Sequence, residues 1–191
     1  MFKKFLLLAS AGLMAIGTAA AAEKVKIGFV TTITTPAGVI GKDMVDAVNL
    51  AMEDIGGKMA GRDVELIIED DGFKPAIGKQ KTDKLVKQDK VQFVTGFIWS
   101  HVLLASQKSA LGAGKFLISS NAGPSQMAGK LCHKNFFSTS WQNDQTPMAM
   151  GEVLNLNNVK SLYVMAPNYA AGKNMVSGVA RTFKGKIVGK D

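Results

Sequence analysis

Residues 91–120 read VQFVTGFIWSHVLLASQKSALGAGKFLISS, and their pattern decides the fold class. Short apolar runs at 91–97 and 115–120 each predict a buried strand. The residues between them, 101–114, have the composition of a helix and end in glycines, which favour helix termination. A strand, a helix and a second strand in this order form a βαβ unit, which joins parallel strands. The stretch therefore predicts an α/β protein with a parallel sheet.

The same alternation extends towards the N-terminus. Strands are expected at 24–32 and 63–70, with one helix between them and another at 75–87. The helix between them is indicated by an apolar stripe that Gly56-Gly57 ends, formed by Met44, Val48, Met52 and Ile55. Near-continuous apolar strands separated by helices indicate a parallel sheet covered on both faces.

A second α/β series is expected after about Trp141. Residues 135–144 are interpreted as a strand or a hinge segment. After them the pattern predicts a helix, a strand, a helix and the beginning of a strand, at 147–156, 161–166, 170–183 and 185–189. One strand, one helix and a fragment of strand cannot bury a sheet on two faces. We therefore expect a complete first lobe at 23–140, and at 141–191 a hinge region with the start of an incomplete second lobe.

Residues 1–22 have the pattern of a secretory signal peptide. Lys3 and Lys4 form a positive start, residues 5–16 are apolar, and an alanine run ends at Ala22, after which we expect cleavage. The alternative is a transmembrane anchor, but the 12 apolar residues fall short of the roughly 20 that a span needs. We therefore expect export to the periplasm, which disfavours a cytoplasmic enzyme or a gene regulator.

The chain is basic, with 23 Lys and Arg against 15 Asp and Glu. Its lysines are scattered, with no run longer than two, so a solvated basic surface is favoured over a stripe that binds nucleic acid. Cys132 stands alone and is either a free thiol or half of a disulfide. One cysteine and two distant histidines, His101 and His133, do not supply the usual four ligands of zinc. Neither a metal nor a cofactor is expected.

Four loops follow the carboxyl ends of the expected strands, which is where open parallel sheets bind ligands. They read TTITTPAGVIG, DDGFKP, GFIWSH and SSNAGPSQMAG, at 31–41, 70–75, 96–101 and 119–129. None of the eight Gly-Lys dipeptides is followed by Ser or Thr, so no P-loop is present in the sequence. The loop after the first strand also lacks the G-x-G-x-x-G fingerprint of dinucleotide-binding proteins.

Hydrolase chemistry has little support in these loops. Ser125 follows Gly123 at the spacing of the G-x-S-x-G motif, but Met127 replaces its second glycine. A triad would also need His101 or His133, and neither has an evident orienting acid. No catalytic residue is therefore expected.

The loops instead favour ligand recognition. Hydroxyl, imidazole, amide and backbone N–H groups form a donor-rich rim, and Trp99 adds an aromatic surface. The rim comprises Ser100, His101, Ser119, Ser120 and Asn121, with the backbone around Ala122 and Gly123. Two of these loops lead toward helix N-termini, where unsatisfied amides favour an anion. Each residue has a structural alternative: the serines can cap a helix or close a turn, His101 can cap or be solvated, and Trp99 can lie in the core.

Four stretches together resemble the leucine/isoleucine/valine-binding type of periplasmic solute-binding protein of ABC transport systems. They are KIGFVTTITTPAGVIGKDMVDAVNLAMEDIGGKMAGRDVELIIEDDG, VTGFIWSHVLLAS, FLISSNAGPS and APNYAAGKN, and the resemblance covers 23–191. It implies a type I periplasmic binding protein fold, in which a hinge joins two Rossmann-like lobes that clamp the ligand. It further implies a monomer that delivers its ligand to an ABC permease, and it allows a partner for Cys132 outside this chain.

The resemblance also implies ligand-binding residues. Ser100 matches a serine that follows the third strand, and residues 121–123 (Asn121, Ala122 and Gly123) occupy the second ligand-holding loop. Gly123 stands where a threonine is expected. The sequences NAGPS and FFSTSWQND are more similar to those of members that take up aromatic carboxylates. Tyr169 matches a tyrosine that reaches the ligand from the second lobe, whereas Trp99 and His101 match more loosely.

Taken together, the residues and the resemblance lead us to expect the solute-binding component of an ABC importer for a small carboxylate, either an aromatic acid or an amino acid. The alternatives are a ligand-sensing module on the same lobes without transport and a secreted α/β hydrolase. An importer should be encoded beside a permease and an ATPase, whereas a hydrolase should turn over an ester.

Overall fold

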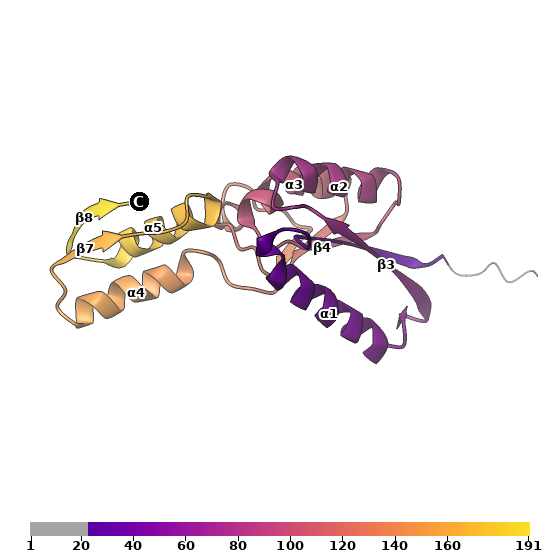
Figure 1. Cartoon of the computed structure of the whole chain (residues 1–191), viewed down its shortest axis with the longest axis horizontal. Helices are drawn as coiled ribbons and strands as arrows, with labels where there is room; N and C mark the ends of the chain where they lie inside the picture. The colour runs from indigo at the N-terminus through magenta and orange to yellow at the C-terminus, as the bar shows by residue number, and fades with distance from the viewer. Residues whose placement is uncertain (1–22) are drawn as a thin grey trace, which may run out of the picture.

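The computed structural model describes residues 23–191, which form two unequal parts (Figure 1). The N-terminal part (23–138) is built on a six-stranded sheet in the order β2-β3-β1-β4-β5-β6. Its strands are β1 (Val25–Thr31), β2 (Lys58–Met59), β3 (Arg62–Asp70), β4 (Phe93–Gly96), β5 (Phe116–Ser119) and β6 (Phe136–Ser138). All pairs are parallel except β2 with β3. The expectation of an α/β protein with a mostly parallel sheet is therefore confirmed.

The edge strand β2 was not expected from the sequence. It pairs with β3 through a two-residue loop, Ala60-Gly61, with φ of 49° and 75°. Positive φ at both central residues is typical of the type I′ hairpin turn. A strand of only two residues shows no period in the sequence, so Gly61 is the one local signal for this hairpin.

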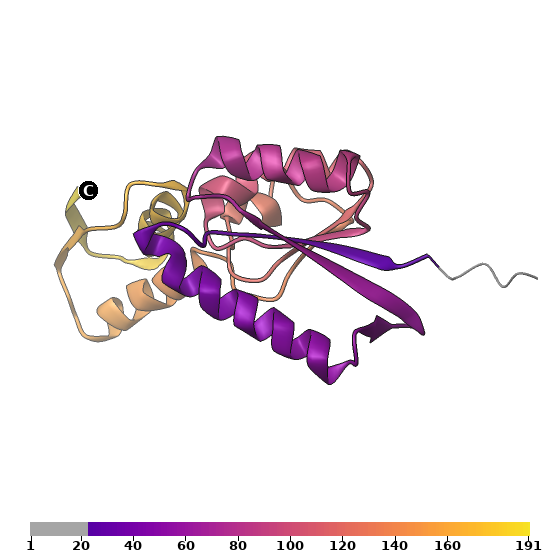
Figure 2. The same ribbon diagram turned by 45° about the vertical axis from the view of Figure 1, so that its right-hand side comes forward.

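Helices cover both faces of the sheet, as the apolar strands predict. α2 (Pro75–Lys87) and α3 (Ser100–Leu111) lie on one face, and α1 (Val39–Asp54) lies on the other (Figures 1 and 2). The largest cluster of buried residues belongs to the face of α2 and α3. Its members are Val30, Leu85, Val86, Val91, Val94, Phe97, Val102, Leu103, Ala110, Leu111, Leu117, Ala122 and Met127.

The face beneath α1 is packed less closely. Met44, Val48 and Met52 are only half-buried, and no residue of α1 belongs to the buried cluster. Ile55, the last member of the expected stripe, follows the end of the helix and is 43% exposed. The apolar stripe therefore predicts the side of α1 that faces the sheet, but only through Met44, Val48 and Met52, which lie within the helix.

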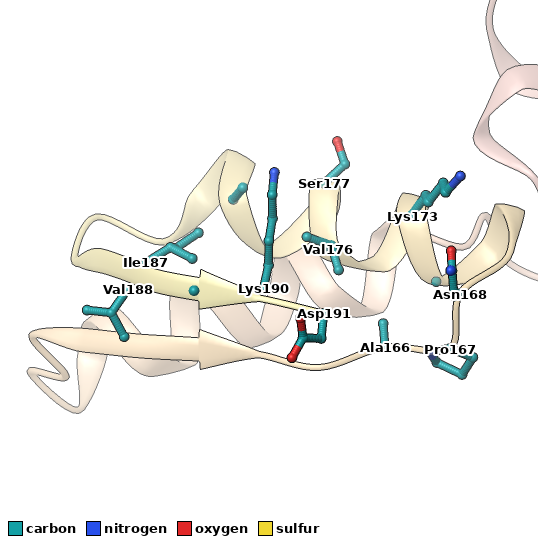
Figure 3. A pocket seen from close by; sticks show the side chains of 13 residues that line it. Ala166, Pro167, Asn168, Lys173, Val176, Ser177, Ile187, Val188, Lys190 and Asp191 are labelled. Atoms are coloured by element: carbon teal, nitrogen blue, oxygen red, sulfur yellow. The ribbon is translucent and has the colours of Figure 1, made fainter.

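Residues 145–191 form the C-terminal part, joined to the sheet by the linker 139–144. It consists of α4 (Gln145–Leu156), β7 (Ser161–Val164), α5 (Ala170–Thr182) and β8 (Lys186–Lys190). β7 and β8 pair in parallel, and the order of the four elements is the one that the sequence predicts. Between α5 and β8 lies a hollow of about 730 Å³, across which Val176 and Ile187 face one another (Figure 3).

Within 23–191, no helix combines the length and the apolar character that a membrane span requires. The expected signal peptide and its cleavage after Ala22 lie outside the described residues.

Candidate ligand-binding site

The candidate site lies where the strand order reverses. β1 pairs with β3 on one side and with β4 on the other, so the chain leaves β1 and β4 in opposite directions. A crevice at the carboxyl ends of such strands is the usual ligand site of open α/β sheets. The loops after β3 and β5 leave the sheet at the same edge, so the four loops converge there as the sequence predicts.

Four aromatic rings from three segments of the chain meet at this edge. Phe73 follows β3, Trp99 and His101 follow β4, and Tyr169 precedes α5 in the C-terminal part. The ring centroids are 4.8 Å apart for Phe73–Trp99, 5.0 Å for Phe73–His101, 5.3 Å for His101–Tyr169 and 6.0 Å for Trp99–Tyr169. Each ring therefore meets two others edge to face, a favoured aromatic geometry. We call these residues the ring quartet; three of the four were singled out from the sequence.

Phe73 is the member that sequence reasoning missed. It lies in the DDGFKP loop, is 41% exposed and has a φ of 66°, which is rare for a bulky residue. Its N–H donates to Asp71 Oδ1 at 2.8 Å, which holds the turn in place. The Asp-Gly dipeptide before Phe73 signals a turn, but nothing in the sequence indicates that the turn aims this ring at Trp99.

Trp99 is anchored by a hydrogen bond from the edge of its indole. Its Nε1 donates to Thr32 Oγ1 at 2.9 Å, and the Thr32 hydroxyl donates to Asp71 Oδ1. Asp71 is fully buried, and this burial raises the pKa of its carboxyl group. Thr32 and Asp71 were part of the quoted loops but were not predicted as site residues, because both bonds join residues far apart in sequence.

Ser100 and His101 are the first two residues of α3. Ser100 is 1% exposed, and its Oγ accepts a hydrogen bond of 2.9 Å from Asn143 Nδ2 in the linker. The N-cap of α3 is Trp99, whose side chain makes no capping bond. The first amides of a helix have no intrahelical acceptor, so this helix terminus favours an anion. His101 is half-buried, and within 23–191 its Nδ1 has no hydrogen-bond partner.

The loop after β5 is held to the rest of the N-terminal part by its own polar groups. Ala122 is buried, and its N–H donates to Phe97 O at 2.9 Å. The Ser119 hydroxyl donates to Ala122 O at 2.5 Å, and the Asn121 side chain is exposed at the edge while its Nδ2 donates to Ile98 O at 3.0 Å. The amide of Ala122, expected as a donor at the rim, is therefore already used within the fold.

Gly123 is buried beneath the linker. A Cβ at this position would lie 2.0 Å from Trp141 O, and Asn143 N donates to Gly123 O at 2.8 Å. The threonine that the family resemblance led us to expect here has no room against this backbone. The glycine is explained by the close approach of the linker.

Tyr169 joins the site from the C-terminal part. Burial raises the pKa of its phenol, and its ring meets both Trp99 and His101. A second contact between the parts is made by Asn174 of α5, whose Oδ1 accepts from Ser125 N at 3.1 Å. The structure thus brings together Trp99, Ser100, His101 and Tyr169 at one edge of the sheet.

Among residues 23–191, no group of His, Cys, Asp and Glu side chains is placed to hold a metal ion. Cys132 is exposed and forms no disulfide within 23–191.

Residues 24–191 match the family model described as periplasmic binding protein. The chain belongs to this family, and the resemblance drawn from the sequence is confirmed. A comparison with curated proteins gave no match.

Solved structures lead to the same family. A solute-binding protein of an ABC transporter from Rhodopseudomonas palustris in complex with benzoate is 29% identical, with a TM-score of 0.82 over 88% of this chain and 48% of the other. One from strain BisB5 in complex with 3,4-dihydroxybenzoic acid is 25% identical, with a TM-score of 0.80 over 87% and 46%. The branched-chain amino acid transporter substrate-binding protein of Streptococcus pneumoniae with isoleucine is 25% identical, with a TM-score of 0.74 over 88% and 49%. The chain spans about half the length of these structures, and the type I fold is confirmed.

Proposed function

We propose that this protein is the solute-binding component of an ABC import system and that it takes up a small aromatic carboxylate. In this proposal it acts in the periplasm as a monomer, closes two lobes around the ligand and delivers it to a membrane permease. Family membership supports the solute-binding role, and two similar structures hold benzoates. The single observation that carries the choice of ligand is the ring quartet beside the N-terminus of α3.

The proposed ligand suits the chemistry of the two halves of this site. A flat apolar ring fits against the edges and faces of Trp99 and Tyr169, and burying about 150 Å² of it contributes roughly 4 kcal/mol. The carboxylate would lie at the start of α3, near the Ser100 hydroxyl and the first backbone N–H groups of the helix. Each charge-assisted hydrogen bond contributes about 1.5–3 kcal/mol, which offsets a desolvation cost of several kcal/mol. Apolar area then supplies much of the affinity, and the polar groups select the carboxylate.

A branched-chain amino acid is the second candidate ligand, because a similar structure holds isoleucine. An amino acid carries an ammonium group that needs acceptors, and a threonine hydroxyl was the expected one. Gly123 supplies no side chain there and has no room for one. This feature favours the aromatic acid.

Transport is tested by uptake of radiolabelled benzoate in cells with and without the gene. Loss of uptake in the deletion strain, restored by the gene, is expected of an importer component. Unchanged uptake together with a lost transcriptional response to benzoate would instead favour the sensing module.

Export is tested by N-terminal sequencing of the protein from the periplasmic fraction. The pattern of residues 1–22 predicts a mature chain that begins at Glu23. A periplasmic protein that retains Met1 would contradict this part of the proposal.

A further inference from the structure

Two buried polar residues lie behind the ring quartet and contact two of its members. Thr32 is fully buried at the end of β1, and Asp71 is fully buried at the end of β3. The Asp71 backbone is also fixed, because its N–H donates to Thr31 O at 2.9 Å and its carbonyl accepts from Lys74 N at 2.9 Å. The end of β1 therefore helps to fix the position of Asp71.

The hydrogen bonds between these residues have only one possible direction. An indole N–H donates and cannot accept, so Thr32 Oγ1 accepts from Trp99 Nε1. The single hydroxyl proton of Thr32 must then be donated onward, and Asp71 Oδ1 accepts it. Asp71 Oδ1 also accepts from Phe73 N. One carboxylate oxygen thus holds two rings of the quartet, Trp99 through a hydroxyl and Phe73 through its backbone.

This arrangement makes the angle between the two rings depend on two fully buried residues, Thr32 and Asp71. Phe73 and Trp99 lie at 86° to one another, with centroids 4.8 Å apart. Without the bond to Thr32, the indole of Trp99 could turn about its side-chain torsions, and its partly buried N–H would lose its acceptor. Rings that are already held in place bind a flat ligand more tightly than mobile rings do, because ordering them on binding lowers the affinity.

We propose that Thr32 is a positioning residue that holds Trp99 for a flat aromatic ligand and that Asp71 orients the Thr32 hydroxyl for this task. The statement about the ligand rests on the function proposed above. The statement about Trp99 rests on the hydrogen bonds of the structure alone. The role of Asp71 is that of an acceptor and does not require a negative charge. Its Oδ2 has no hydrogen-bond partner within 23–191.

The chain offers four well-matched variants. Thr32→Val keeps the shape of the side chain and removes the hydroxyl, whereas Thr32→Ser keeps the hydroxyl. Asp71→Asn keeps an acceptor oxygen at Oδ1. Thr31→Val is the control, because Thr31 is the neighbouring threonine, is equally buried and has a hydroxyl without a hydrogen-bond partner among residues 23–191.

The first measurement uses NMR to monitor hydrogen exchange of the indole N–H groups in the absence of ligand. The sequence has two tryptophans, so Trp141, which is 64% exposed, serves as a fast-exchanging reference in the same sample. In the parent chain, and in the T31V, T32S and D71N variants, the Trp99 N–H is expected to exchange slowly. In the T32V variant it is expected to exchange about tenfold faster, which corresponds to loss of one buried hydrogen bond.

The second measurement is the affinity of the whole protein for benzoate. T32V is expected to bind about fivefold more weakly, while T31V and T32S stay within about twofold of the parent. If the parent binds no benzoate, the proposed ligand is wrong, and the exchange data alone decide whether Thr32 positions Trp99. If Trp99 exchanges as slowly in T32V as in the parent, the inference is overturned, whatever the melting temperature of the variant. Fast exchange in D71N would likewise overturn the role assigned to Asp71.

Discussion

Asn143 and Ser100 meet across the boundary between the linker and the N-terminal part, where Asn143 Nδ2 donates to Ser100 Oγ at 2.9 Å. Both side chains are buried. Because the serine oxygen accepts this bond, its own proton remains available for a ligand carboxylate at the start of α3. The linker therefore orients the hydroxyl that we assign to the ligand.

Ser100→Ala is accordingly expected to weaken benzoate binding by roughly 5- to 150-fold, or about 1–3 kcal/mol. Calorimetry on the whole protein measures this change. Ser106→Ala is the matched control, since Ser106 lies on the same helix, is fully buried and has a hydroxyl without a partner in the described part of the chain. A lower melting temperature for S100A with unaltered benzoate affinity would assign Ser100 to structure alone.

Gly123→Thr should destabilise the fold instead of restoring an amino-acid site. A Cβ at Gly123 meets Trp141 O at 2.0 Å, and a backbone atom cannot rotate away as a side chain can. We expect a loss of about 2 kcal/mol or more in the free energy of unfolding, measured by denaturant titration. Ala128→Thr adds the same side chain at an exposed position nearby and should change stability little. Equal stability of G123T and A128T would show that the linker does not lie where the structure places it.

Arg181 should stabilise the junction of the linker with α4 and α5. The Asp144 side chain is 1% exposed, and it accepts from Arg181 and from Gln142 Nε2. Arg181→Met leaves this buried carboxylate with fewer partners, and we expect a loss of about 1–3 kcal/mol. Lys58→Met removes the exposed 3.7 Å pair with Asp63 and should cost at most about 0.5 kcal/mol. Thermal melts of both variants test the difference, and equal losses would contradict it.

Asp71→Asn should change how stability depends on pH. Burial raises the pKa of Asp71 above its ordinary value of 3.8, so the folded state holds this proton more tightly than the unfolded state does. The stabilisation that this proton provides is complete below the unfolded pKa and is lost as the pH rises through the folded pKa. The stability of D71N relative to the parent should therefore increase from about pH 4 to about pH 7. A difference that does not vary with pH would contradict the raised pKa.

Asp83 provides the control of opposite sign. Its hydrogen bond from Lys79 and its neighbour Lys87 lower the pKa of this half-buried carboxyl from 3.8 to about 2. The stabilisation is then present above the unfolded pKa and is lost as the pH falls through the folded one. Asp83→Asn should thus be less stable than the parent at neutral pH, and the difference should shrink below about pH 4.

The sequence predicted the helices and strands well because their periods are local. The apolar runs at β1, β3, β4 and β5 and the glycines after α3 need only nearby residues to be recognised. The two-residue strand β2 is too short to show such a period. Trp99 and His101 were singled out because they follow a strand, at the edge where parallel sheets bind their ligands. Tyr169 was singled out because it matches a tyrosine of the family that the sequence resembles.

The remainder of the site depends on contacts between distant residues, which no local pattern shows. Trp99 meets Thr32 over 67 positions, and Asn143 meets Ser100 over 43. Gly123 was interpreted as the loss of a ligand hydroxyl, and the structure adds the reason why no side chain fits there, which is the approach of Trp141 from another segment. Phe73 was not predicted because a strained turn sets the direction of its ring. No strand or helix pattern marks this residue in the sequence.

The central claim, that the protein binds a small aromatic carboxylate, is tested most directly by calorimetric titration of the whole protein with benzoate and with isoleucine. The ring quartet and the absence of a hydroxyl at Gly123 predict saturable binding of benzoate, at least about tenfold tighter than that of isoleucine, a difference of about 1.4 kcal/mol. Tight binding of isoleucine without any response to benzoate would contradict the account.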